Sequence, residues 1–512
     1  MVKTSATATV TPDSTSHVSL DYALEAQGLE QIGDGKDLVR WAATNPRHPR
    51  NWSPLRKAYD ITIIILLEFY TTAVSTSGAT AAKNAQEQLG IDPTISLLLY
   101  VSTYLLAQGI GSVVFPPYSE CFGRKRLYVV STVMYSVFCA IIGATSHPAA
   151  AAVGRIITGF LSAVPSVVIA GSIEDMFSTR ERIWLTLPYI AVADFGIATG
   201  PVMSTYITAA WGWQWVFYVA AIVTGILAIL LCTIRESRPT LLLEREVAQL
   251  RKVTGDESLE ALNPDRVLDM DTFVRNVIFR PAQLLVSEPI IMAVSIVCGV
   301  SSGIIYLFTD VLPPVYASFG LSTTTASLPF LAIGFGFIPN IYTRFLEYRM
   351  AIKRKARHEP VLPEHKLVGY IIAAPALMGA LWWFAWTIPP AAHVHWFVSV
   401  VPLFFIGFAI NEFGIVLVGY MADSYLSFSA SAFAALCLVR CVLAASFPLF
   451  TGRMFDALGP NVGVSVLAVV ATVFCAIAPL LRIYGERLRK RSKFASYSLK
   501  VYTENTVEKS GP

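Results

Sequence analysis

The sequence predicts an all-α protein that crosses a membrane twelve times, with its helices in two groups of six. Hydrophobic residues make up 54% of the 512-residue chain and charged residues only 14%, whereas a soluble protein has about 25% charged residues. Apolar runs of membrane-spanning length recur, and one long polar connection divides them into two equal sets. A water-soluble chain of this size could not cover so much apolar surface, so the bilayer is its expected solvent.

Each apolar run is close to the roughly 20 residues that a helix needs to cross about 30 Å of hydrocarbon. A spanning segment must satisfy its own backbone hydrogen bonds, which leaves the helix as the only plausible form. The predicted helices cover residues 58–81, 96–117, 127–146, 149–172, 183–208, 213–234, 289–310, 324–345, 367–388, 394–419, 429–452 and 460–483.

The distribution of lysine and arginine predicts the orientation. If the N-terminus is cytoplasmic, all but four of the 39 basic residues fall in the tails and the cytoplasmic loops. Lys83 and Arg453 lie on the opposite side, and Arg155 and Arg440 lie inside helices. Because basic residues gather on the cytoplasmic side, both termini are predicted to be cytoplasmic. The N-terminal tail has no apolar core of a signal peptide, so the first helix is expected to direct insertion.

The predicted helices divide the chain into five regions. They are a cytoplasmic tail (1–57), a six-helix bundle (58–234), a cytoplasmic linker (235–288), a second six-helix bundle (289–484) and a cytoplasmic tail (485–512). Within the linker, residues 241–250 predict an amphipathic helix that lies on the inner membrane surface. Two bundles joined in this way are the layout of a transporter that rocks about a central site.

Short motifs follow one another in a set order, each on its expected side of the membrane. They are residues 45–53, 119–125, 155–159, 196–201, 280–289, 306–308, 423–425, 440, 447–450 and 488–493. Together they resemble the major facilitator superfamily, and specifically its fungal branch of twelve-helix drug:proton antiporters. Two positions depart from the family pattern. Pro116 stands where a glycine is usual, and Ser204 with Thr205 replaces a glycine pair, which leaves the packing of helix five open.

The resemblance implies the major facilitator fold and a function. The expected protein is a proton-coupled secondary active transporter that exports small amphipathic organic molecules, either xenobiotics or a secondary metabolite or toxin. Its partners would be the substrate, protons and the lipid bilayer, with no cofactor besides the proton gradient, and a monomer is expected. The cell membrane is the expected location, with the vacuolar membrane as the alternative. The altered end of the helix-five motif leaves open an importer of a small nutrient, such as a polyamine or vitamin.

Composition argues against two other classes. The net charge of +4 is too weak to suggest a nucleic-acid partner. A membrane enzyme would need clustered histidines or a histidine and aspartate set near one face, and the seven histidines form no such group. No metal site and no enzymatic activity are therefore expected.

A gate is predicted at the cytoplasmic ends of helices two and eleven. Gly123 permits a tight reversal, and the bases after it, Arg124 and Lys125, would stay in water or contact phosphate headgroups. Glu120 ends helix two, and Asp423 is expected to open helix eleven, where the positive helix terminus favours a carboxylate. A charged contact between Glu120, Arg124 and the start of helix eleven would close this face. The alternative is that the bases only fix the topology.

Charged residues inside the membrane are candidates for coupling, because each costs about 2.5–3.5 kcal/mol to insert. Asp194, in helix five, is the first candidate for the proton site, and Glu68, in helix one, is its rival. Neither matches the family pattern. Arg155 does match it, in a position that the family links to proton coupling, and Arg440 is the second buried cation. For each acid the alternative is a satisfied structural pair, which is the favoured interpretation for Glu412.

Backbone features and a cavity complete the prediction. Gly196 and Gly200 lie four residues apart and would let helix five approach its partner closely, while Pro201 would kink it. In the family such a seam marks exporters, and generic helix packing is the alternative. Polar and aromatic residues on inward faces are candidates for substrate binding, and they are Tyr104, Gln108, Tyr306, Phe308, Asn340 and Asn411.

Overall fold

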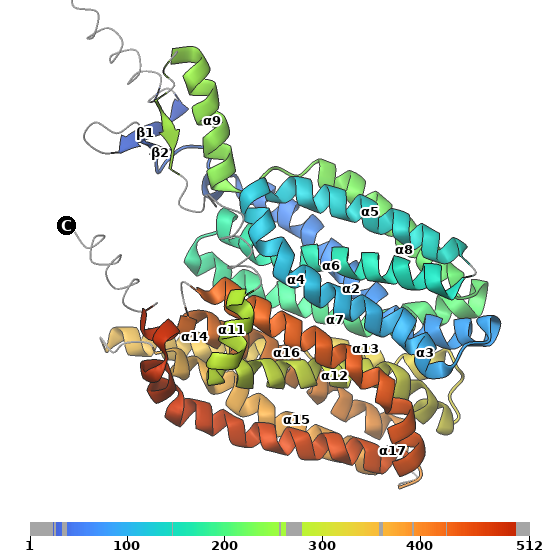
Figure 1. Cartoon of the computed structure of the whole chain (residues 1–512). Coiled ribbons are helices and arrows are strands. Elements are labelled where there is room, and N and C mark those ends of the chain that lie inside the picture. The colour runs from blue at the N-terminus through green and yellow to red at the C-terminus, as the bar shows by residue number, and fades with distance from the viewer. Residues whose placement is uncertain are drawn as a thin grey trace, which may run out of the picture.

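The computed structural model describes residues 24, 27–32, 38–145, 147–254, 256, 258–262, 279–357, 362–391, 394–425 and 428–497. Among these, eleven helices are long and apolar enough to span a membrane. One of them, α17 (Ser429–Arg491), consists of two helices, because the backbone at Gly459 is non-helical with φ at +77°. The ring of Phe428, before α17, lies 5.3 Å from that of Phe494, after it, so the chain reverses direction within α17 (Figure 1). The predicted count of twelve is thereby confirmed.

The helices of the N-terminal bundle overlap the predicted ranges, and the first of them ends at Leu89 where residue 81 was predicted. They are α2 (Pro54–Leu89), α4 (Thr103–Phe122), α5 (Arg124–Ala144), α6 (Pro148–Met176), α7 (Thr179–Trp211) and α8 (Gln214–Cys232). A short helix, α3 (Pro93–Leu97), and a π-helical turn, η2 (Leu98–Ser102), lead without a break into α4. Helix two therefore contains a π-bulge, a feature that often occurs at functional positions.

The C-terminal bundle contains one interrupted helix. Predicted helix eight is divided into η4 (Thr325–Ser327), α13 (Phe330–Phe335) and α14 (Asn340–Ala356). At the break, a Cβ on Gly336 would lie 2.4 Å from the backbone of Gly407, so the two segments touch through glycines. The other elements are α11 (Arg280–Ser287), α12 (Pro289–Ser318), η5 (Pro363–Leu367), α15 (Val368–Thr387) and α16 (Trp396–Tyr425).

Local sequence signals explain where several helices begin. Proline occupies the first turn of α2, α3, α6 and α12, where its missing N–H leaves no bond unmade. Asp92 caps α3 by accepting from the backbone N–H of Thr94 at 2.8 Å. Ser178 and Glu181 form a capping box at the start of α7. These hydrogen bonds hold the pKa of the Glu181 carboxyl below its usual value.

The two ends of the bundle differ. Pro54 begins α2 and Arg491 ends α17 at one end, from which α9 (Pro239–Thr254) also projects, and we call this end the tail face. The opposite end is the loop face, where short connections such as Gly90 and Gly212 join helices. Figure 1 shows the long helices running side by side between these two faces.

A small three-stranded sheet lies outside the bundle at the tail face (Figure 1). Strand β1 (Leu29–Ile32) pairs antiparallel with β2 (Leu38–Trp41), which pairs in parallel with β3 (Glu260–Ala261). Its apolar residues pack against α9 in a separate core that consists of Leu24, Leu29, Val39, Leu243, Val247, Leu250 and Leu259. The N-terminal tail and the linker thus form one folded unit.

This unit corrects the prediction for residues 241–250. They do form an amphipathic helix, α9, but its apolar face is covered by β1 and β2 and not by the membrane surface. The indole of Trp41 donates to the carbonyl of Pro239 at 3.1 Å, and Arg47 forms an ion pair with Glu246. The apolar stripe was read correctly, but a sequence does not show which surface covers such a stripe.

Candidate functional site

Helices α2 and α7 form a tight seam near the middle of the N-terminal bundle. A Cβ on Gly196 would lie 2.4 Å from the carbonyl oxygen of Phe69, and one on Gly200 would lie 2.2 Å from that of Ala73. Contacts under 3 Å are not possible for a real Cβ, so only glycine fits at both positions. The predicted close approach of helix five is confirmed, and its partner is helix one.

Threonines on α2 hydrogen-bond across this seam. The hydroxyls of Thr72 and Thr76 donate to the carbonyls of Ala193 and Ile197, at 3.1 and 2.9 Å. Ile197 is four residues before Pro201, which has no N–H, so its carbonyl lacks the usual helical partner and Thr76 supplies one. Pro201 and Thr76 are therefore complementary across the seam.

Ser204 continues the same seam, one turn further toward the loop face. Its side chain is fully buried and its hydroxyl donates to that of Thr80 at 2.9 Å. The replacement of the family's glycine by serine therefore keeps helix five packed, because the extra hydroxyl finds a partner. Residues 72, 76 and 80 follow a spacing of four, which is the signal that sequence reasoning missed.

Three charged groups from both bundles lie near one another in the middle of the membrane-spanning helices, and we call them the coupling cluster. Arg440 of α17 acts electrostatically on both Glu68 of α2 and Asp194 of α7. The two acids also act on each other. The predicted coupling residues Glu68, Asp194 and Arg440 are thus brought together, with the cation supplied by the opposite bundle.

The coupling cluster is not a closed set of ion pairs. The Oε2 atom of Glu68 is buried without a hydrogen-bond partner. Among the residues that the structure describes, no direct ion pair joins Arg440 to either carboxyl. Glu68 is only 3% exposed, whereas Asp194 and Arg440 are part-exposed.

Arg155, the fourth predicted coupling residue, lies elsewhere. It is fully buried, and its Nε atom donates to the carbonyl of Tyr100, in the π-helical turn, at 2.7 Å. Its guanidinium lies 4.2 Å from the centre of the Tyr104 ring. No carboxylate pairs with it among the described residues, so Arg155 is held by carbonyls and aromatic faces within the N-terminal bundle.

The predicted gate residues Gly123, Arg124 and Lys125 lie in a network at the tail face. Gly123 has φ at +91°, which makes the reversal between α4 and α5 possible. The carboxylate of Glu236 accepts from the backbone N–H groups of Arg124 and Lys125, at 2.9 and 3.0 Å, and so caps α5. Glu236 follows α8, so this cap ties three helices of one bundle together.

The side chain of Arg124 is buried against the end of α6. Its Nε atom lies 2.6 Å from Asp175, and a second base, Arg238, lies 3.8 Å from the same carboxylate. Sequence reasoning missed Asp175 and Glu236, because the predicted fourth helix ended at residue 172 and the carboxylates lie far from Arg124 in the chain.

Asp423 is not placed as predicted. It belongs to the last turn of α16, helix ten, and does not open helix eleven. Because a helix C-terminus repels negative charge, a compensating base is expected there, and Lys366 forms an ion pair with Asp423. Both partners belong to the C-terminal bundle. Glu120 ends α4 with an exposed side chain. The described ion pairs of Arg124 and Asp423 thus stay within one bundle each, and none of them joins Arg124 to Asp423.

We expect the Asp175→Asn substitution to destabilise the protein by about 3–5 kcal/mol, because it leaves Arg124 buried without its carboxylate. The side chains of Arg124 and Asp175 are both 5% exposed. The neighbouring Glu174→Gln substitution is the control, since Glu174 pairs with Arg182 at the surface and its side chain is 61% exposed. Its expected cost is about 0–1 kcal/mol. Thermal unfolding of both purified variants in detergent measures the difference, and equal shifts would contradict a buried pair.

Glu412 is a satisfied structural carboxylate, as favoured. It is fully buried and accepts from Asn340 and from Thr343, the latter at 2.8 Å, and it pairs with Arg344. All of its partners lie on α14, so the contact fastens helix eight to helix ten. Asn340, predicted to bind substrate, is committed to this contact.

The other candidates for substrate binding divide into two sets. Tyr104 donates to the carbonyl of Thr71 at 3.3 Å, and Phe308 packs on Phe384 with ring centres 5.7 Å apart, so their described contacts lie inside one bundle. Two candidates lie near the interface between the bundles. Tyr306 hydrogen-bonds Ser75 of the other bundle at 2.6 Å, and Gln108 precedes Gly109, which lies against Cys441 of the other bundle. A third candidate, Asn411, has a buried Oδ1 atom without a hydrogen-bond partner.

An ion pair and a hydrogen bond join the two bundles toward the loop face. Lys83 of α2 forms an ion pair with Asp310 of α12 at 2.8 Å, and Ser102 donates to the carbonyl of Ala445 at 2.7 Å. At the tail face, the described ion pairs of Arg124, Lys366 and Arg489 are each internal to one bundle. The Lys83–Asp310 pair was missed, although the sequence placed both residues near the same face.

Two helical bundles that meet at a buried charge cluster define a multi-pass membrane transporter. A family model described as the Major Facilitator Superfamily matches residues 62–447. The chain belongs to the Major Facilitator Superfamily, and its predicted fold is confirmed. A crystal structure of a D-xylose–proton symporter shares this fold, with a TM-score of 0.53, 17% identity, and coverage of 82% of this chain and 97% of that one.

Several fungal proteins are similar over most of the chain. This chain is 28% identical over 469 residues to the efflux pump radE of Floropilus chiversii, and the aligned region covers 90% of this chain and 86% of that protein. It is 29% identical over 462 residues to the multidrug transporter TPO1_2 of Candida glabrata, covering 89% and 79%. It is 30% identical over 464 residues to the efflux pump MFS2 of Trichophyton rubrum, covering 90% and 77%.

Proposed function

We propose that the chain is a proton-coupled transporter that exports small amphipathic organic molecules by alternating access. The names of its relatives, efflux pumps and a multidrug transporter, support export. The observation that carries the proposal is the coupling cluster, in which two acids of one bundle face a cation of the other. An electrostatic interaction between the two bundles changes when an acid gains or loses a proton, and it also changes when the bundles move relative to each other.

The proposed cycle follows from competition for these groups. When the tail face is open, the carboxyls of Glu68 and Asp194 release protons and the substrate binds between the bundles. When the loop face is open, the carboxyls take up protons again, and the substrate leaves because it loses its contacts with them. Removing a carboxyl from water favours its neutral form, while the charge of Arg440 favours the ionised form. These opposed effects allow small movements of Arg440 to change which form prevails.

The proposed orientation places the tail face in the cytoplasm. The bases of α9, α14 and the end of α17 lie at this face, as the preference of basic residues for the cytoplasmic side requires. In that orientation the Lys83–Asp310 pair joins the two bundles on the outer side of the membrane. We further propose the cell membrane as the location.

The test is proton release on substrate binding by the purified protein. With rhodamine 6G as an amphipathic probe and a pH-sensitive dye, the wild-type protein is expected to release protons. We expect the single variants Asp194→Asn and Glu68→Gln to release at most about half as many, and the double variant to release none, because each substitution removes a titrating carboxyl. In liposomes with a pH gradient, the double variant should accumulate about 10-fold less probe or worse.

Glu181→Gln is the matched control, since Glu181 is an exposed acid at the start of α7 and should leave both measurements unchanged. Binding of the probe to each variant, measured by fluorescence polarisation, separates a loss of coupling from a loss of binding. If the double variant releases protons and accumulates the probe like the wild type, the coupling cluster is not the proton site.

A further inference from the structure

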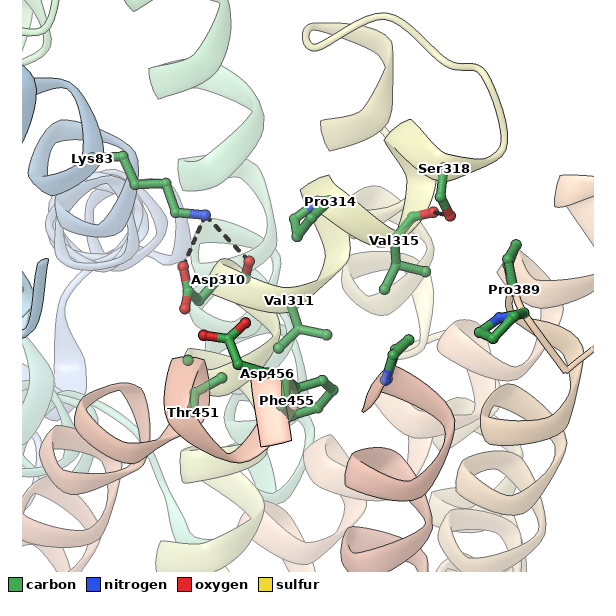
Figure 2. Close-up of a pocket in the computed structure, with 13 residues that line it drawn as sticks. Lys83, Asp310, Val311, Pro314, Val315, Ser318, Pro389, Thr451, Phe455 and Asp456 are labelled. Carbon is green, nitrogen blue, oxygen red and sulfur yellow. Dashed lines mark hydrogen bonds and ion pairs between the residues drawn. The ribbon is translucent and has the colours of Figure 1, made fainter. Parts of the chain in front are cut away.

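A cavity of about 520 Å³ opens at the loop face, away from the coupling cluster. Its walls are mostly apolar and come from the C-terminal bundle, with Val311 and Val315 on α12 and Phe455 on α17 (Figure 2). Two carboxylates, Asp310 and Asp456, also line it. An apolar chamber with a few convergent polar groups is the usual form of a site for a small organic molecule.

The N-terminal bundle contributes Lys83, alone among the described residues that line the cavity. Figure 2 shows its ammonium group reaching across to Asp310, where it lies 2.8 Å from the carboxylate and also donates to the backbone carbonyl at 3.3 Å. The side chain of Asp310 is 14% exposed and that of Lys83 is 48% exposed. The ion pair therefore joins a half-exposed lysine of one bundle to a carboxylate that lines the cavity in the other bundle.

Asp456 gives the cavity an excess of negative charge. Its carboxylate lies beside that of Asp310 in Figure 2, and no ion pair of the described residues includes it. Asp456 is exposed, so its carboxylate can be reached from the loop face by a ligand that enters the cavity. The aromatic ring of Phe455 lies next to it in the same wall, and such a ring attracts a cation at its face.

We propose that this cavity is a second binding site, open to the loop face, for an organic cation with an apolar body. The cation is held by Asp456 and Phe455 and competes with Lys83 for Asp310. Once Lys83 is displaced, the ion pair that joins the two bundles at this face is lost. A ligand that binds better when the pair is broken shifts the population toward the form with an open loop face. The site needs no proton coupling and no assumption about the direction of transport.

The binding test uses the purified full-length chain in detergent and two probes of the same shape and opposite charge, tetraphenylphosphonium and tetraphenylborate. In equilibrium dialysis, Asp456→Asn and Phe455→Ala should each weaken phosphonium binding about 3- to 10-fold. Lys83→Gln should strengthen it several-fold, because Asp310 becomes free. Binding of the borate should depend on none of these residues.

Glu87→Gln is the matched control, since Glu87 is an exposed acid near the same face and does not line the cavity. It should leave phosphonium binding unchanged. Repeating the series in the Glu68→Gln, Asp194→Asn background removes the coupling acids. If phosphonium binding still depends on Asp456 in that background, the binding site at the loop face is supported independently of the proposed proton coupling. Equal phosphonium affinity in the wild type, Asp456→Asn and Lys83→Gln would overturn the site.

The competition with Lys83 has its own readout. Hydrogen–deuterium exchange at the loop-face ends of α2 and α12 should rise when phosphonium is added, and should be high in Lys83→Gln without it. The Asp456→Asn variant should show a smaller response at the same phosphonium concentration. If phosphonium binds in the cavity but lowers exchange at both helix ends, Lys83 is not displaced and that part of the proposal is wrong.

Discussion

Replacing Arg440 with glutamine should abolish uphill transport and leave the substrate able to bind. Arg440 supplies the cation that acts on both Glu68 and Asp194, so its loss leaves two carboxyls in the membrane interior without a counter-charge. Without Arg440, protonation of the two acids no longer changes a charge interaction between the bundles, so proton release and the movement of the bundles should be uncoupled. Uphill transport should therefore fall to the level of protein-free liposomes.

A charge-compensated variant separates coupling from folding. Arg440→Gln alone should also lower the unfolding temperature, whereas the triple variant Glu68→Gln, Asp194→Asn, Arg440→Gln removes every charge of the coupling cluster together. We expect the triple variant to recover thermal stability and to remain without proton release. Thermal unfolding and the dye assay measure the two properties on the same sample. Uphill transport that survives in Arg440→Gln would show that the two acids work without this cation.

The Gly200→Val substitution should disrupt the N-terminal bundle. A Cβ at this position would lie 2.2 Å from the carbonyl oxygen of Ala73 and 2.1 Å from the hydroxyl of Thr76. Overpacking usually costs about 1–3 kcal/mol, and here a backbone atom is in the way, so α7 must move away from α2. That movement would also separate Thr76 from the carbonyl of Ile197, which Pro201 leaves without a helical partner.

The expected result is a large fall in the yield of folded, detergent-stable protein, measured by fluorescence size-exclusion chromatography. Gly379→Val is the control, because a Cβ on Gly379 has nothing within 4 Å and the change of helix propensity is the same. Gly200→Ala should give an intermediate effect. If Gly200→Val folds as well as Gly379→Val, the seam is looser than the contact distances require.

Much of the architecture follows from the sequence because the bilayer restricts the choices. A long apolar run must be a helix and must cross, so each predicted span overlaps a helix of the structure, although several helices extend well beyond the predicted bounds. The π-helical turn in helix two and the interruption of helix eight at Gly336 were not foreseen. The Gly196 and Gly200 pair also predicted a close seam, since small residues four apart leave room for only one kind of contact. These features depend on local pattern alone.

Sequence reasoning missed contacts between residues that lie far apart in the chain and close together in the fold. Arg124 needed an acid, and neither the pattern around it nor the predicted end of helix four pointed to Asp175. Asp423 was assigned to the wrong helix because polar residues were taken to end helix ten, which continues to Tyr425. Glu68 and Asp194 were each identified as costly intramembrane charges, but only the fold shows that one arginine of the opposite bundle serves both.

The small sheet at the tail face joins segments that are made at very different times. Strand β2 pairs with β3, and the helices from α2 to α8 are synthesised between them. The ribosome must therefore deliver the whole first bundle before this sheet can close. The pairing of β2 with β3 therefore brings the segment before the first membrane helix back to the segment after the sixth, so one small sheet connects the two ends of the first bundle.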